Sequence, residues 1–340
     1  MVSTATSDPV RTRPYLLLGT TMLLWGSGFG SSKVIVDYLP HPVVAALRFG
    51  GGAVALLIAL RLFRRSDARR ASWRDRARAA GAGVLGVFVY NVLFFWGLSL
   101  APAIDGSTIV PVMSPVLTTS FLLLAGKEKA SPARVAGLAV GAAGALIFFA
   151  GSGGVAGGGQ GRLAGDLLFL LSACCWAAFT LAGRRVLAGI EPLEATTYAT
   201  LSGAALLAVY SVPSAVEVAW QNVPVHVWLN VVFVALGPTA VANLLYYRGI
   251  HAVGPASASI MMFLVPVVGT TCSAAFLGES FGTVQAVGAA VLLVGAVLAV
   301  TQGRLPWAGR RDGQGSACGR ASPITSARAR AVRRRRGTRP

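Results

Sequence analysis

Apolar stretches of about 20 residues follow one another along most of this 340-residue chain, separated by short polar or charged connections. Each stretch is long enough to cross the roughly 30 Å hydrocarbon layer of a bilayer as an α-helix. Windows of this length predict ten membrane-spanning helices. The predicted spans are residues 15–36, 42–62, 79–98, 107–125, 133–151, 165–182, 195–213, 227–247, 257–277 and 283–301.

Distinctive residues within these stretches recur with a constant offset of 151 residues. The matched pairs are Trp25 with Trp176, Lys33 with Arg184, Pro115 with Pro266, Glu128 with Glu279, Gly137 with Gly288, and Gly144 with Gly295. Each copy holds five spans, and a unit with an odd number of crossings ends on the side opposite to where it began. The sequence therefore predicts an all-α integral membrane protein built from two inverted five-helix repeats around one central cavity, as in many secondary transporters.

These boundaries divide the chain into five parts. We expect a cytoplasmic tail (1–14), a first repeat (15–151), a glycine-rich outer linker (152–164), a second repeat (165–302) and a disordered basic tail (303–340).

Composition supports a membrane protein, because 54% of the residues are hydrophobic and only 12% are charged. The net charge of +18 is concentrated before span one, between spans two and three, and after span ten. Alternate connections carry almost no Lys or Arg, with Arg162 the exception between spans five and six. Because Lys and Arg collect on the cytoplasmic side, both termini are predicted to be cytoplasmic. Abundant Arg, Ala and Gly indicate a GC-rich bacterial genome, and hence a multi-pass protein of a bacterial cell membrane.

This charge pattern argues against nucleic-acid binding. We interpret the basic tail as a topology anchor, with contact between Arg333–Arg336 and anionic lipid head groups as the alternative. The four cysteines have neither metal-site nor disulfide spacing, and no phosphate-binding glycine loop is present. We therefore expect no cofactor, no metal and no ATP hydrolysis.

Several features occur in a characteristic order along the chain. They are Trp25-Gly26-Ser27-Gly28-Phe29-Gly30-Ser31-Ser32-Lys33, Pro42 with Ala45-Ala46-Leu47-Arg48-Phe49, Gly165-Asp166 before Trp176, and a Pro in each fourth span followed thirteen residues later by Glu. Over residues 15–302 the chain resembles the drug/metabolite transporter superfamily, in its EamA-type branch of ten-helix carriers. The resemblance implies an alternating-access carrier of small organic solutes, often an exporter of amino acids, related metabolites or toxic compounds. One departure is Asp105, which opens the fourth span where small residues are usual.

Polar and aromatic residues at membrane depth are the candidates for lining a solute cavity, because they are costly in hydrocarbon. Trp25 and Lys33 are eight residues apart on one helical stripe, and Arg48 lies roughly 9 Å from the outer end of span two. We expect these side chains to face a solute that carries a carboxylate or another acceptor group. Alternatively, Lys33 extends to the outer interface and Arg48 caps neighbouring carbonyls.

Spans three and eight contain a second matched pair, Asn91–Gly97 and Asn243–Gly249, shifted by one residue from the main offset. Further cavity candidates are Tyr90, Asn91, Trp96, Trp176, Tyr198, Asn243, Tyr246 and Tyr247. An amide in hydrocarbon needs a hydrogen-bond partner, so the alternative for the asparagines is a bridge between helices. For the aromatic residues, the alternative is a belt at the membrane interface.

Pro115 and Pro266 are predicted to kink the fourth and ninth spans and to free the carbonyls of Pro111 and Met262. Symmetric kinks suit gating, although static kinks that improve packing are the alternative.

Glu128 and Glu279 end these two spans, and we expect each to serve the start of the following helix, with Ser131-Pro132 or Ser280 as the cap. Proton coupling is the alternative role for these acids. Close helix approach is expected at Gly26 with Gly30, and at Gly137 with Gly141.

Together these patterns predict a secondary-active or facilitative transporter, working as an exporter of a small organic metabolite and acting as a monomer or homodimer. An enzyme is not expected, because His41, His226 and His251 are scattered over different connections. The acidic residues lie in tails, loops or span ends, so facilitated exchange and proton antiport both stay open. The alternative function is that of a non-transporting membrane sensor or scaffold.

Overall fold

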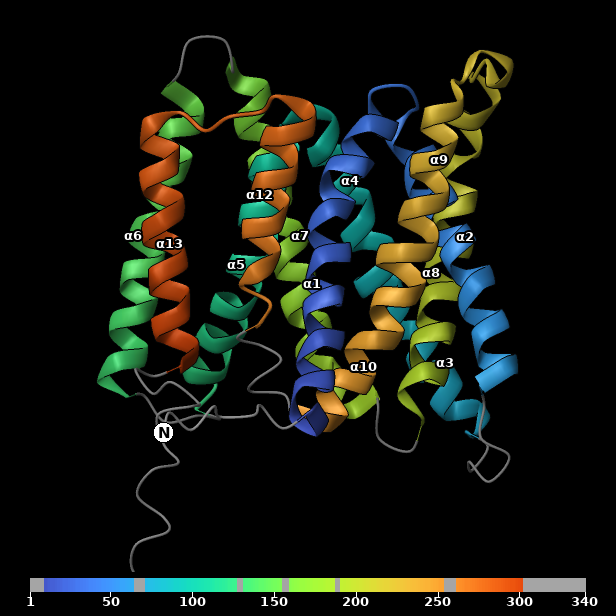
Figure 1. Ribbon diagram of the computed structural model, residues 1–340, viewed down its shortest axis with the longest axis horizontal. Helices are drawn as coiled ribbons and strands as arrows, with labels where there is room; N and C mark the ends of the chain where they lie inside the picture. The colour runs from blue at the N-terminus through green and yellow to red at the C-terminus, as the bar shows by residue number, and fades with distance from the viewer. Residues whose placement is uncertain are drawn as a thin grey trace, which may run out of the picture. The chain divides into compact units, whose positions relative to one another are not determined.

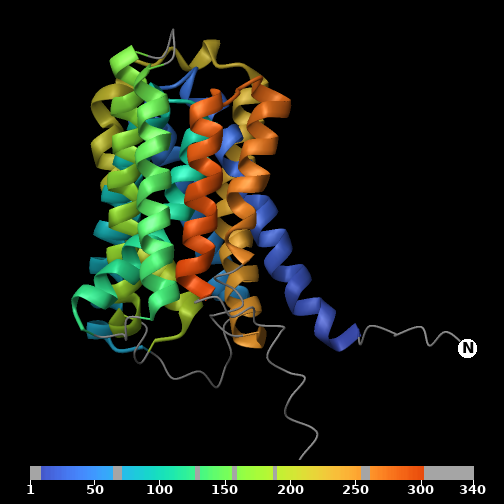
Figure 2. The same ribbon diagram turned by 90° about the vertical axis from the view of Figure 1, so that its left-hand side faces the viewer.

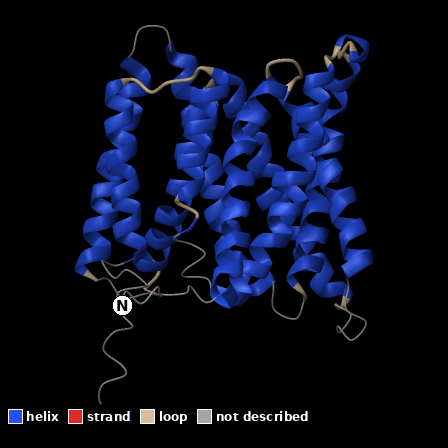
Figure 3. Cartoon of the chain, in the orientation of Figure 1, coloured by secondary structure: helices blue, strands red, loops and turns tan. Residues whose placement is uncertain are grey.

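The computed structural model describes residues 9–63, 71–126, 131–154, 159–186, 190–253 and 261–301. Within these ranges the chain forms helices joined by short connections and contains no strand (Figure 3). The prediction of an all-α protein is therefore confirmed. Glu128, the basic tail from residue 303 onward and part of the ninth predicted span lie outside the described residues.

The first half of the chain supplies five helical segments, coloured blue to green in Figure 1. They are α1 (Pro9–Val36), α2 (His41–Phe63), α3 (Trp73–Gly83) continued by η1 (Val84–Val89) and α4 (Tyr90–Leu100), α5 (Ala103–Leu124) and α6 (Pro132–Gly154). The third span begins six residues earlier than predicted, at Trp73, because Ser72 and Asp75 form a capping box that starts the helix in its charged first turn. A hydropathy window excludes these charged residues, whereas the helical backbone includes them.

The second half supplies the counterparts of these spans. They are α7 (Gly159–Val186), α8 (Pro192–Val216), α9 (Val225–Val234) continued by η3 (Ala235–Val241) and α10 (Ala242–Val253), α12 (Leu264–Leu277) and α13 (Thr283–Thr301), with the short 3₁₀ turn η2 (Trp220–Asn222) before α9. Ten successive helical segments are thus present among the described residues, in the order predicted. Among the described residues, seven helical segments are long and apolar enough to cross a membrane, and α12 and α13 are shorter apolar helices.

The principal helix contacts between the two halves are symmetric, because each of them has an equivalent contact when the halves are exchanged. Helix α6 packs against α13, and α2 against α8, so equivalent helices meet each other. Helix α1 packs against α12 and α10, while its counterpart α7 packs against α5 and α4. Figure 1 shows α1 rising from the lower to the upper end of the bundle and α7 descending from the upper to the lower end.

Duplicated glycines bring α6 and α13 into close contact, and these helices lie side by side in Figures 1 and 2. A Cβ atom added to Gly144 would lie 2.3 Å from the backbone nitrogen of Leu292, and one added to Gly137 would lie 2.3 Å from that of Ala299. Their repeat counterparts Gly288 and Gly295 have similarly close backbone neighbours. The packing role predicted for Gly137 is therefore confirmed.

The first half of α5 is enclosed on every side. Each residue from Ala103 to Ser114 is buried. A helix buried all round belongs to a protein core rather than to a lipid-facing surface. Helix α5 reaches this position by packing against α7, α12 and α13.

The segments η1 and η3 are π-helical and begin at equivalent positions, Val84 and Ala235. Segment η1 has six residues and η3 has seven. This extra residue accounts for the shifted offset between Asn91 and Asn243. π-Helical turns inside α-helices occur frequently at functional sites.

Candidate functional site

A cavity lies between the two halves of the chain. Seven of the residues singled out from the sequence line it: Trp25, Arg48, Tyr90, Pro111, Trp176, Asn243 and Met262. Further lining residues that were not predicted to face the cavity include Phe29, Phe49, Phe94, Ser114, Pro238 and Thr239. The space open to the centres of water-sized spheres is about 130 Å³. One water needs roughly 10–15 Å³ on this measure, so the cavity has room for a small organic molecule.

The equivalent residues Trp25 and Trp176 give the cavity an aromatic wall from each half. The indole Nε1 of Trp25 donates a 3.0 Å hydrogen bond to the carbonyl of Pro238, within η3. Its ring centroid lies 4.9 Å from that of Tyr246, whose hydroxyl lies 3.6 Å from the sulfur of Met262. These contacts fix the indole of Trp25 in place beside the cavity.

Trp176, from the second half, packs against Tyr90 of the first half, with ring centroids 5.5 Å apart. Tyr90 in turn stacks against Phe94. The aromatic surface therefore continues from α7 to α4. Such a surface suits the apolar body of a solute, because ligand sites are mostly apolar with a few placed polar groups.

Arg48 extends from α2 to the cavity. Its Nε donates to Thr239 Oγ1 and its Nη1 donates to Ser32 Oγ, both at 3.3 Å. The guanidinium carbon lies 5.3 Å from the ring centroid of Phe49 and 5.9 Å from that of Phe95. The capping of carbonyls, considered as an alternative, is not observed for Arg48, because its hydrogen-bond partners in the described residues are hydroxyl groups.

Lys33 lies outside the cavity lining. Its Nζ donates a 3.0 Å hydrogen bond to the carbonyl of Leu98, in the last turn of α4, and lies 3.4 Å from Asp37 Oδ1. Cations are favoured at helix C-termini, where carbonyls carry partial negative charge. The structure therefore places Lys33 in a contact between α1 and α4 and does not bring it to the cavity with Trp25.

Two aromatic candidates also lie away from the cavity. Trp96 is 46% exposed and stacks on the ring of His41, 6.2 Å between centroids. Tyr198 packs beneath the guanidinium of Arg76, which lies 5.3 Å from its ring centroid. Tyr247 belongs to α10, and its side chain lies outside the described residues.

The two asparagines of the shifted pair bond within their own helices. Asn91 Nδ2 donates to the carbonyl of Val87, and Asn243 Nδ2 donates to that of Thr239, each at 2.6 Å. The bridges between helices considered from the sequence are not formed by these amide nitrogens. Each amide instead binds a carbonyl of a π-helical segment, and Asn243 also lines the cavity.

The two predicted proline kinks differ. Helix α5 continues through both Pro111 and Pro115. Pro266, by contrast, lies in the first turn of α12, after a break at Met262 and Phe263. The prediction of a freed carbonyl at Met262 is wrong, because this carbonyl accepts a 3.0 Å hydrogen bond from the amide of Val265.

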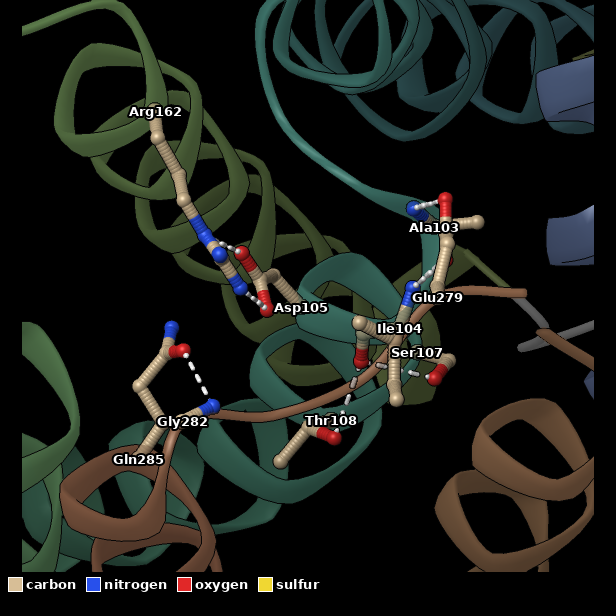
Figure 4. A network of polar contacts seen from close by, with 9 residues as sticks. All are labelled: Ala103, Ile104, Asp105, Ser107, Thr108, Arg162, Glu279, Gly282 and Gln285. Atoms are coloured by element: carbon tan, nitrogen blue, oxygen red, sulfur yellow. Dashed lines mark hydrogen bonds and ion pairs between the residues drawn. The ribbon is translucent and has the colours of Figure 1, made fainter. Parts of the chain in front are cut away.

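Glu279 caps α5 rather than the helix that follows it, as Figure 4 shows. Its Oε1 accepts from the Ala103 amide at 2.9 Å, and its Oε2 accepts from the Ile104 amide at 2.8 Å. The predicted role at the start of α13 is therefore wrong. The cause is Gly278, which ends α12 with φ of 66° and redirects the chain toward α5.

The helix that follows Glu279 is capped by another residue, since Gln285 Oε1 accepts from the Gly282 amide at 3.2 Å. In the first half, the cap predicted at Ser131 is confirmed by a 3.2 Å hydrogen bond from the amide of Arg134.

Asp105 and Arg162 form a bidentate ion pair next to this cap (Figure 4). Arg162 Nε lies 2.7 Å from Asp105 Oδ2, and its Nη2 lies 2.8 Å from Oδ1. The carboxylate is fully buried and the guanidinium is 17% exposed. This pair explains two unusual residues of the sequence. Arg162, the one cation between spans five and six, neutralises Asp105, the unusual acid at the start of span four. Residues 159–164, assigned to the linker, accordingly form the first turns of α7.

Comparison with known families decides what kind of protein contains this cavity. The EamA-like transporter family matches the chain twice, over residues 12–150 and 163–301. The chain belongs to the EamA-like transporter family. It is therefore a multi-pass membrane transporter with two EamA domains, and not an enzyme.

Relatives of this EamA-like transporter are found in bacteria and archaea. The uncharacterized transporter YyaM of Bacillus subtilis is 28% identical over 86% of this chain and 95% of its own length. A probable terminal-alkyne amino-acid exporter of Streptantibioticus cattleyicolor is 28% identical over 82% of this chain and 90% of its own length. The aromatic amino acid exporter YddG of Ancylobacter novellus is 26% identical over 75% and 85%, respectively.

A solved crystal structure of a protein superimposes on this EamA-like transporter with a TM-score of 0.60 and 24% sequence identity. It covers 86% of this chain and 98% of that chain. At this identity the likeness shows the shared fold.

Sequence reasoning missed Pro238 and Thr239, although a proline within the apolar span 227–247 is itself a signal. A proline in the middle of an apolar span needs neighbouring groups to satisfy the freed backbone. The carbonyl of Val234, four residues before Pro238, accepts a 2.9 Å hydrogen bond from Thr239 Oγ1, and the carbonyl of Pro238 itself accepts one from Trp25 Nε1.

Proposed function

We propose that this EamA-like transporter exports a small organic metabolite, of the size of an amino acid, across the cytoplasmic membrane by alternating access. The observation that carries this proposal is the cavity at the seam of the halves, lined by the equivalent residues Trp25 and Trp176. A site built from both halves is exposed to either side when one half rocks against the other. Two relatives, the probable terminal-alkyne amino-acid exporter and the aromatic amino acid exporter YddG, support the export direction and the amino-acid size class.

In this proposal the two repeats, residues 15–151 and 165–302, are inverted in the membrane and both termini are cytoplasmic. The opposite directions of α1 and α7 in Figure 1 support the inversion. The alternation of arginine-rich and arginine-poor connections supports the sidedness. The bilayer is then the permanent partner of the apolar outer surface, and the solute is the partner of the cavity.

Opening toward the outer side requires the polar contacts at the start of α5 to break. Glu279 ties the first turn of α5 to the connection between α12 and α13, and Asp105 ties it to α7 through Arg162. These contacts hold elements of both halves together. Their release would separate the halves at the outer end, while the aromatic walls keep hold of the solute.

Counterflow in proteoliposomes tests the proposal. Vesicles preloaded with an unlabelled amino acid should accumulate the same labelled compound, across a panel of aromatic and aliphatic amino acids and related metabolites. Trp176→Ala should abolish accumulation, whereas Trp96→Ala should retain it, because Trp96 lies outside the cavity. Imposing a pH gradient on the same vesicles distinguishes proton antiport from facilitated exchange.

Retained counterflow in Trp25→Ala and Trp176→Ala would contradict the role of the cavity. A folded protein that binds solutes without exchanging any of them would favour the sensor or scaffold.

A further inference from the structure

Arg48 is the one charged side chain among the described residues that line the cavity. The ion pairs in the described part of the chain do not include it, so no acid there neutralises its charge. A cation at membrane depth is costly unless a counter-charge or a ligand compensates it. The structure thus contains a positive charge in the cavity that its own described residues leave uncompensated.

The neighbours of Arg48 orient the guanidinium without neutralising it. Thr239 Oγ1 donates its own proton to the carbonyl of Val234 at 2.9 Å, so its lone pairs are available to Arg48 Nε. Ser32 Oγ accepts from Nη1. Nη2 has no hydrogen-bond partner among the described residues. A guanidinium held at Nε and Nη1 in this way leaves the N–H groups of Nη2 for a ligand.

The counterpart of Arg48 in the second repeat is Ala199. The duplication therefore supplies aromatic walls from both halves but a cation from only one. A solute that matches this arrangement has an anionic group at one end and an apolar or aromatic body at the other.

We propose that Arg48 binds the carboxylate of the transported solute and is the residue that selects for it. A carboxylate matches the planar fork of a guanidinium better than a neutral acceptor does, because both of its oxygens accept charge-assisted hydrogen bonds. The body of the solute lies between Trp25 and Trp176. Because the described lining contains no acid for an ammonium group, the amino group of an amino acid is dispensable. This inference rests on the proposed function and deepens it.

Equilibrium binding to the full-length protein in detergent tests the inference, with three probes that share one ring. The probes are 3-phenylpropionate, phenylalanine and 2-phenylethylamine, and the dissociation constant of each is measured by titration calorimetry. The two carboxylates should bind, and the amine should bind at least about 30-fold more weakly, since two charge-assisted hydrogen bonds are lost. Equal binding of the amine would overturn the inference.

Substitutions of Arg48 distinguish the effect of its positive charge from that of its planar guanidinium group. Arg48→Gln should weaken 3-phenylpropionate binding about 100-fold, and Arg48→Lys, which keeps the charge alone, about 10-fold. Lys33→Gln is the matched control, because it removes a cation outside the cavity, and binding should stay within about twofold of wild type. Undiminished binding of 3-phenylpropionate to Arg48→Gln would refute the assignment. Should this variant fail to fold, the three probes on the wild-type protein decide alone.

Counterflow keeps the two proposals apart. Exchange of amines or neutral solutes, without binding of either carboxylate, would refute the anion site and leave the carrier intact. Carboxylate binding without any counterflow would refute the carrier, while the anion site would stand.

Discussion

Replacing Arg162 should destabilise the protein more than replacing its partner Asp105. Arg162→Gln leaves a fully buried carboxylate without its bidentate partner, whereas Asp105→Asn leaves a guanidinium that is 17% exposed. Arg162 also attracts Asp166 and Glu279 electrostatically, so it keeps favourable neighbours in the second variant. Removing one partner of a buried pair costs about 3–5 kcal/mol, which we expect for Arg162→Gln. For Asp105→Asn we expect about 1–2 kcal/mol.

The free energy of unfolding can be measured by titrating sodium dodecyl sulfate into detergent micelles and following helix content by circular dichroism. The double variant Asp105→Asn with Arg162→Gln should be more stable than the sum of the single losses predicts, because no unpaired charge is then buried. Arg78→Gln is the control. It removes a pair with Asp75 whose guanidinium is 49% exposed, and such surface pairs contribute under about 1 kcal/mol. If Arg162→Gln costs no more than Arg78→Gln, the pair does not stabilise the start of α5.

Three further outcomes are expected. Gly144→Ala should lower the free energy of unfolding by about 1–3 kcal/mol, because the new Cβ meets the backbone of α13. Gly81→Ala is the control, because a Cβ there has open space. Equal melting temperatures of the two variants would contradict the close packing. Trp25→Phe keeps an aromatic ring but loses the bond to Pro238, so counterflow affinity should fall by about 1 kcal/mol, and an unchanged half-saturation concentration would count against this contact. Glu279→Ala should expose the first amides of α5 to faster hydrogen exchange, and unaltered exchange there would rule out the cap.

The helical class, the order of the ten helical segments and the duplication were all accessible from sequence, because hydropathy and the constant offset are local or periodic signals. The convergence of Trp25 and Trp176 on one cavity followed from the same symmetry. The contact of Glu279 with α5 was not accessible, since it joins residues far apart in sequence. The position of Glu279 also depends on the left-handed conformation of Gly278, which ends α12.

The π-helical segments illustrate a signal that was present but ambiguous. A shift of one residue between Asn91 and Asn243 was visible in the sequence, yet an insertion in a helix and an insertion in a loop produce the same shift. Only the backbone shows that the extra residue lengthens the π-helical segment η3. Lys33 illustrates the opposite case, because its spacing from Trp25 suggested a shared face, while the carbonyl of Leu98 offered a nearer partner.

The additional residue in η3 has a thermodynamic consequence for the empty carrier. Two identical halves would give two end states of equal energy at zero membrane potential, related by the two-fold axis of the inverted repeat. In the proposed alternating-access cycle, the halves differ in the lengths of η1 and η3, so we expect the two end states of the unloaded protein to differ in energy and one orientation to be preferred. A solute arriving from the disfavoured side then meets a competent site only part of the time, so half-saturation differs between the two faces of the membrane even without an energy source.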